Sequence, residues 1–89
     1  MVIIKGLKER LEEELKKREI KITDYKEYRE DRTIGVVYLE LEAEELTSDD
    51  FDIIEEILEK HGVRIKSWRI WAPCDYIVME IWAEEKMFW

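Results

Sequence analysis

The two side chains best suited to chemistry, a histidine and a thiol, each occur once in this 89-residue chain, as His61 and Cys74. A metal site or an activated nucleophile needs several converging ligands, or a base that a third group orients. His61 stands at the expected end of a helix, where the helix dipole favours a cation, and Cys74 follows Pro73 in an expected turn. We therefore predict that neither residue is catalytic or binds a metal.

The acidic residues and the glycines do not indicate catalysis either. Acids form the runs Glu12-Glu13-Glu14 and Asp49-Asp50, and successive helical residues point in different directions, which is typical of a solvated helix surface. The glycines stand at positions 6, 35 and 62, too far apart for a loop that cradles phosphate. The sequence predicts a protein that is not an enzyme and has no cofactor or metal.

Charge and composition narrow the class of partner. The formal net charge is −8, so the surface as a whole repels phosphate and anionic lipid. Charged residues make up 43% of the chain, and Asn and Gln do not occur. This usage is typical of hyperthermophilic proteins, because side-chain amides are thermolabile and ion pairs lose less to desolvation at high temperature.

Size and cysteine content indicate one cytoplasmic domain, residues 1–89. The chain has no Gly/Ser/Pro-rich break and can bury one modest core. One cysteine cannot form an internal disulfide, and no apolar run approaches the length of a membrane helix, about 20 residues. Lys5 interrupts the short apolar start, so we expect no signal peptide.

Apolar spacing predicts two helices and two β-hairpins. One apolar stripe runs through residues 4–15, and a second helix begins at Thr47 or Ser48 with an approximate capping box and ends before Gly62. Alternating segments follow each helix, at residues 19–28 with 33–43 and at 63–70 with 74–84. The predicted registers oppose these pairs: Ile20 with Leu41, Ile22 with Leu39, Lys21 with Glu40, Val63 with Ile81, Ile65 with Met79, and Arg64 with Glu80.

The two halves also resemble each other, which predicts a duplicated unit at residues 5–45 and 48–85. Residues 39–45, LELEAEE, resemble residues 79–85, MEIWAEE, and the matched segments are three residues closer together in the second copy. The expected fold is an α+β two-layer sandwich, a four-stranded antiparallel sheet with both helices on one face. An alternative makes residues 2–4 a first strand and gives a ferredoxin-like order.

The expected order of elements, a helix followed by two strands and then repeated, resembles that of the LAGLIDADG homing endonucleases, whose saddle-shaped sheet binds DNA. The motif itself is absent from residues 6–11, GLKERL, which lack the small packing residues of that family and the acid at the end of its helix interface. We assign no family on this basis.

The sheet face that the helices leave open is predicted to be unusually apolar. Its expected apolar and aromatic members are Tyr25, Ile34, Val36, Tyr38, Trp68, Ile70, Tyr76, Val78 and Trp82. An open face normally carries polar residues, and monomers rarely expose so large an apolar patch. We therefore expect an occupant: a second copy, a different protein, or single-stranded nucleic acid.

The preferred interpretation is a small acidic protein-interaction module that is a homodimer, and its charge would also suit an inhibitor that mimics nucleic acid. The predicted interface comprises Tyr25, Tyr38, Trp68, Ile70, Tyr76, Val78, Trp82, Phe88 and Trp89, with the last two folding back or exchanging in the dimer. The alternative, a single-stranded nucleic-acid platform, would stack bases on Tyr25 and Trp68 and bind phosphates through Arg64, Lys66 and Arg69. The net charge opposes this alternative.

Overall fold

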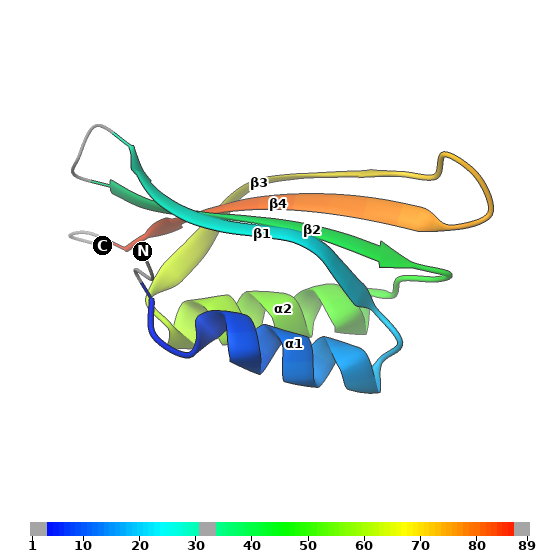
Figure 1. Cartoon of the computed structure of the whole chain (residues 1–89), viewed down its shortest axis with the longest axis horizontal. Coiled ribbons are helices and arrows are strands. Elements are labelled where there is room, and N and C mark those ends of the chain that lie inside the picture. The colour runs from blue at the N-terminus through cyan, green and yellow to red at the C-terminus, as the bar shows by residue number, and fades with distance from the viewer. Residues whose placement is uncertain (1–3, 31–33, 87–89) are drawn as a thin grey trace.

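The computed structural model describes residues 4–30 and 34–86 as one layer of helices under one sheet (Figure 1). Its elements are α1 (Leu7–Lys17), β1 (Lys21–Glu30), β2 (Ile34–Ala43), α2 (Ser48–Lys60), β3 (Val63–Trp71) and β4 (Ile77–Glu85). The alternative first strand at residues 2–4 falls largely outside the described residues, and Ile4 itself lies in a bend.

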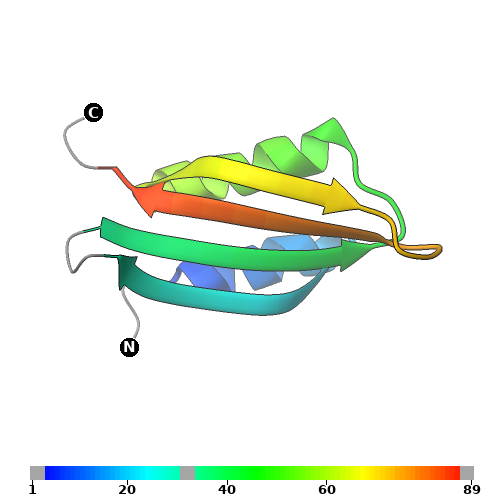
Figure 2. The same cartoon turned by 90° about the horizontal axis from the view of Figure 1, so that it is seen from above.

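The four strands form one antiparallel sheet in the order β1-β2-β4-β3. Both helices cover the same face of this sheet, and the other face is open (Figures 1 and 2). The predicted α+β sandwich is therefore confirmed. Its core combines the helix stripes with one face of the two central strands: Leu7, Leu11, Leu15, Val37, Leu39, Leu41, Ile54, Leu58, Met79, Ile81 and Ala83 are all buried.

The helix ends follow from local sequence. Thr47 accepts a hydrogen bond from the backbone N–H of Asp50, whose carboxylate in turn accepts from the Thr47 N–H, so the predicted capping box is present. Gly62 adopts φ 81° directly after α2, a conformation that costs glycine little and that ends the helix. Gly6, at φ 80°, is the N-cap of α1, where a side-chain cap is absent.

The strand registers differ from the predicted ones. Ile22, not Ile20, pairs with Leu41, and Val63 pairs with Glu85 instead of Ile81. Both edge strands, β1 and β3, contain a β-bulge. In β1, Thr23 has no partner between the pairs Ile22–Leu41 and Asp24–Glu40. In β3, Lys66 has no partner between the pairs Ile65–Ala83 and Ser67–Trp82. A bulge inserts one residue that the partner strand does not match, so simple alternation fails beyond it.

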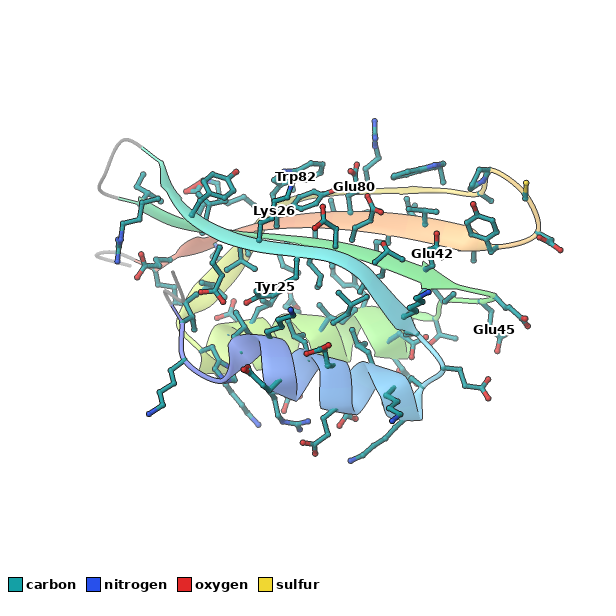
Figure 3. The ribbon with its side chains drawn as sticks, viewed as in Figure 1. Tyr25, Lys26, Glu42, Glu45, Glu80 and Trp82 are labelled. Carbon is teal, nitrogen blue, oxygen red and sulfur yellow. The ribbon has the colours of Figure 1, made fainter. Side chains whose placement is uncertain are left out.

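Each bulge moves the following side chains to the other face of the sheet. Tyr25 pairs with the core residue Leu39 and points towards the helices (Figure 3). Trp68 pairs with the core residue Ile81 and packs edge-on against Phe51 of α2, with ring centroids 5.7 Å apart. Ile70, which follows Trp68 at the strand period of two, lies on the same side. The predicted placement of Tyr25, Trp68 and Ile70 on the open face is therefore wrong.

The duplication remains a hypothesis. Both helices lie on one face, and both bulges follow matched isoleucines, Ile22 and Ile65, as a repeated unit would require. However, the pairing matches Leu39 with Ile81, because these residues oppose Tyr25 and Trp68 respectively. The sequence echo had instead matched Leu41 with Ile81.

Candidate interface on the open sheet face

The open face, which we call the outer face, is built from four rows of side chains that cross all four strands. In the strand order β1, β2, β4, β3 the rows are Lys21–Glu42–Val78–Trp71, Asp24–Glu40–Glu80–Arg69, Lys26–Tyr38–Trp82–Ser67 and Tyr28–Val36–Glu84–Arg64. We call them the first to the fourth row. The bulge residues Thr23 and Lys66 add to this face, because Thr23 bonds to Glu40 and Lys66 lines a hollow beside Trp82.

Two glutamates lie directly opposite each other at the centre of the second row. Glu40 on β2 pairs with Glu80 on β4, and like charges in this position destabilise a sheet unless other groups compensate. The Tyr38 hydroxyl lies 2.5 Å from Oε2 of Glu80 and 3.1 Å from Oε2 of Glu40, so its single proton serves one carboxylate at a time. The side chain of Glu80 is only 12% exposed.

The remaining oxygens of this pair reach both edge strands, Glu40 through a hydrogen bond and Glu80 through an ion pair that does not satisfy its Oε1 with a hydrogen bond. Thr23 donates to Oε1 of Glu40 at 2.8 Å, and Nη2 of Arg69 lies 2.9 Å from Oε1 of Glu80. The Arg69 guanidinium in turn stands 4.6 Å from the ring centroid of Trp71, within cation–π range. Burial, followed by the hydrogen bonds to Glu80 and Glu40, raises the pKa of Tyr38, so its hydroxyl stays protonated at neutral pH.

Aromatic and aliphatic groups fill the spaces between these charges. The rings of Tyr38 and Trp82 meet at 5.4 Å, and Nζ of Lys26 lies 5.8 Å from the Tyr38 centroid. Figure 3 shows Lys26, Glu80 and Trp82 on the side of the sheet away from the helices. Val36 and Val78 are almost fully buried although they face away from the helices, so their larger neighbours already cover them.

The outer face is balanced in charge, in contrast to the surface of α2. Among the described side chains of the four rows and the two bulges, the bases are Lys21, Lys26, Arg64, Lys66 and Arg69, and the acids are Asp24, Glu40, Glu42, Glu80 and Glu84, five of each. Helix α2 alone carries six acids, Asp49, Asp50, Asp52, Glu55, Glu56 and Glu59, against the single base Lys60. The net negative charge therefore lies mainly away from the sheet.

A shallow hollow of about 380 Å³ lies across the third and fourth rows. It is lined by Tyr28, Val36, Lys66, Ser67, Trp82 and Glu84, which come from all four strands. The lining combines two aromatic side chains, one aliphatic side chain and one hydroxyl with one base and one acid. Such a hollow can accept a planar side chain that has a polar edge.

The structure places only some of the predicted interface residues on the outer face. Tyr38, Val78 and Trp82 lie on the outer face, whereas Tyr25, Trp68 and Ile70 lie on the helix side. The others cannot be grouped this way: Tyr76 precedes β4 and is exposed, and Phe88 and Trp89 fall outside the described residues.

Sequence reasoning missed two aromatic residues of the outer face, Tyr28 and Trp71. The signal was present, because two polar residues in succession separate Ile22 from Tyr25, and two separate Ile65 from Trp68. Strict alternation allows only one polar residue between inward positions, so each doublet marks a bulge. Reading the doublets this way assigns Tyr28 and Trp71 to the outer face.

The bases proposed for phosphate contact do lie on the outer face. Arg64, Lys66 and Arg69 are all exposed. The two aromatic rings proposed to stack nucleic-acid bases, Tyr25 and Trp68, lie on the opposite side of the sheet. This geometry separates the stacking groups from the cations with which they would have to cooperate.

The other candidate groups are isolated. Nδ1 of His61 lies 2.8 Å from the carbonyl oxygen of Ile57, a contact within the end of α2, and Cys74 is exposed. Among the described residues, groups of three or more His, Cys, Asp or Glu that could hold a metal ion do not occur. None of the helices in the described part of the chain is long and apolar enough to cross a membrane.

Comparison with known protein families, curated proteins and solved structures gives no match for this chain.

Proposed function

We propose that the protein is a small interaction module that forms a homodimer through its outer face. The observation that carries this proposal is the contrast in charge between the two sides of the molecule. A chain with a net charge of −8 repels its own copies over most of its surface, but the outer face has five bases for five acids. Two copies can therefore meet on the outer face without a net charge repulsion.

The side chains of the outer face support the same proposal. Tyr28 and Trp71 are exposed on it, Trp82 is half-buried, and Arg64 and Arg69 stand beside them. Tyrosine, tryptophan and arginine are the residue types that dominate binding energy at protein interfaces. A dimer built in this way would leave the acidic surface of α2 in solvent on both outer sides, free to contact a basic partner.

The proposal is tested by the mass of the protein in solution. Light scattering at high micromolar concentration should show a dimer for the wild type and a monomer for Tyr28→Lys, which replaces an exposed ring of the outer face with a charged ammonium group. Trp68→Lys is the matched control, because Trp68 is an aromatic residue 53% exposed on the helix side, and it should remain dimeric. A monomeric wild type would refute the proposal, as would a dimer that only Trp68→Lys dissociates.

A further inference from the structure

We infer a specific arrangement of this dimer, which rests on the proposed function: the two outer faces stack about a twofold axis perpendicular to the strands, and Trp71 of each copy covers the hollow of the other. The axis runs between the second and third rows. Each strand then lies over the same strand of the second copy, with its direction reversed. The order of the four rows is reversed as well.

Two twofold arrangements stack the outer faces fully. Sheets that pack face to face keep their strands within about 30° of one another, so the axis lies either parallel or perpendicular to the strands. The central pair Glu40–Glu80 distinguishes the two. An axis parallel to the strands places β2 over β4 of the second copy and keeps each row over the same row. Glu40 then lies over Glu80 of the second copy, and Glu80 lies over Glu40 of the second copy.

The parallel axis therefore gathers four carboxylates at the centre of a closed interface. The only base of the second row is Arg69, which this arrangement sets over Asp24 of the second copy, so the four central carboxylates gain no further base on association. Charges that lose water on association are costly unless they gain partners. This arrangement is disfavoured for that reason.

The perpendicular axis avoids the conflict, because the second row then lies over the third row of the second copy. Glu40 meets Tyr38 of the second copy, and Glu80 meets Trp82 of the second copy. At the β1 edge, Asp24 meets Lys26 of the second copy, and the symmetric contact forms as well. Each carboxylate of the second row thus faces an aromatic ring or a base.

The first row then lies over the fourth row of the second copy. On β3, Trp71 stands over Arg64 of the second copy, beside Lys66, Ser67 and Glu84, which line the hollow. On β1, Lys21 stands over Tyr28 of the second copy. Both contacts join a cation to an aromatic ring.

Trp71 suits this position for two reasons. It is 36% exposed in the isolated chain, so it still has ring surface to bury. One of its faces is already fixed by the Arg69 guanidinium, at 4.6 Å, and Arg69 is held by Glu80. A side chain oriented before association loses less conformational entropy when it binds.

The decisive experiment mixes two charge variants. Asp24→Lys and Lys26→Asp should each weaken the dimer, by about tenfold or more in Kd, because each sets like charges against one another across the axis. In a 1:1 mixture every Asp24→Lys chain can pair with a Lys26→Asp chain, and both edge contacts become complementary. Sedimentation velocity should therefore show the mixture to be dimeric where each variant alone is monomeric.

Asp24 and Lys26 of the same copy also form an ion pair, at 3.6 Å, and each variant breaks it. Mixing the two variants cannot restore this pair within either chain, so recovery of the dimer must come from contacts between the chains. If Asp24→Lys is rescued instead by a chain carrying Arg69→Asp, the parallel axis is correct and the inferred arrangement is wrong, although the dimer stands. A monomeric wild type removes both the arrangement and the proposed function.

A second measurement addresses the hollow without altering charge. Trp71→Ala should weaken the dimer by about tenfold or more, as expected for an interface tryptophan, while Trp68→Ala leaves Kd within about threefold. Circular dichroism should show both variants folded. If Trp71→Ala has no more effect than Trp68→Ala, Trp71 does not fill the hollow of the second copy.

Discussion

Each of the two β-hairpins contains a β-bulge, but the hairpins differ in how well the aromatic residue that follows the bulge is covered. In each hairpin a bulge after an isoleucine turns an aromatic residue towards the helices, Tyr25 in β1 and Trp68 in β3. Tyr25 is half-buried, donates a 2.6 Å hydrogen bond to Glu27 and has Nζ of Lys8 5.9 Å from its ring centroid. Trp68 is 53% exposed and contacts the ring of Phe51 by its edge.

In the first hairpin, the segment that leads into α1 is bound beside Tyr25. Glu27 accepts a 2.7 Å hydrogen bond from the backbone N–H of Ile4, so the chain that enters α1 is tied down beside Tyr25. Helix α2 has its own capping box, closed by Asp50, and needs no acid from its hairpin. The residue two after Trp68, as Glu27 is two after Tyr25, is Ile70, which is 45% exposed.

The two hairpins therefore differ in whether a carboxylate on the edge strand binds the segment that leads into the helix. In the first hairpin Glu27 makes this contact, although the N-cap of α1, Gly6, has no side-chain cap. In the second hairpin the acid that closes the capping box stands within α2, and the matched strand position is the apolar Ile70. The β3–β4 hairpin accordingly extends past the helices with exposed apolar side chains on it (Figure 1).

The largest difference between the hairpins is expected when the two aromatic rings are removed in turn. Tyr25→Ala should lower the free energy of unfolding by about 3 kcal/mol, because it removes an aromatic ring that packs against the core and a partly buried hydrogen bond. Trp68→Ala should cost less than about 1 kcal/mol, since about half of that side chain is already exposed to water. Urea denaturation measures both. Equal losses would show that the two hairpins are covered alike.

A smaller effect is expected at Asp50, the acid that makes the second helix independent of its hairpin. Burial alone would raise the pKa of Asp50, but the hydrogen bonds from Thr47 and from Arg18, the latter at 2.7 Å, outweigh it and hold the pKa below its ordinary value of 3.8. Asp50→Asn should therefore cost about 2 kcal/mol at neutral pH, through the weakened cap and the loss of the ion pair with Arg18.

The sign of the pH dependence follows from that lowered pKa. The contribution of the ionised Asp50 is complete above the unfolded-state value near 3.8 and is lost as the pH falls through the lower folded-state value. Thermal unfolding between pH 7 and pH 2 should show the difference between wild type and Asp50→Asn shrinking only in the acid part of this range. A difference that is constant down to pH 2 would contradict the role given to the charge.

The smallest effects concern the matched strand positions Glu27 and Ile70. Glu27→Gln should lower the free energy of unfolding by about 1 kcal/mol, because the Ile4 N–H and the Tyr25 hydroxyl lose an ionised acceptor. Ile70→Gln should change it by less than about 0.5 kcal/mol, as expected for an exposed position. Urea denaturation measures both changes in the free energy of unfolding. A larger loss for Ile70→Gln than for Glu27→Gln would contradict the difference proposed between the two hairpins.

Much of the fold could be predicted from the sequence because helix ends and core stripes are local signals. The capping box at Thr47, the left-handed Gly62 and the stripe of leucines in α1 each depend on a few neighbouring residues. The inward faces of the central strands β2 and β4 were also predicted, because these strands alternate without interruption.

The outer face could be predicted only in part, because its composition depends on the edge strands. A single unmatched residue reverses the assignment of everything beyond it, so Tyr25 and Trp68 were assigned to the wrong face and Tyr28 and Trp71 were missed. The pairing of Glu40 with Glu80 was likewise hidden, since it depends on how β2 and β4 lie side by side, and these strands are far apart in the sequence.

The two bulges have a consequence for how this chain can vary in length. Thr23 and Lys66 are each the extra residue opposite a continuous partner strand, so a chain that lacks either one can pair normally on both sides of the gap. A deletion elsewhere in an edge strand would exchange the two faces of the sheet, whereas a deletion at a bulge would leave every other side chain on its present face. These two positions are therefore where homologues can differ by one residue in mid-strand and still share the same core and the same outer face.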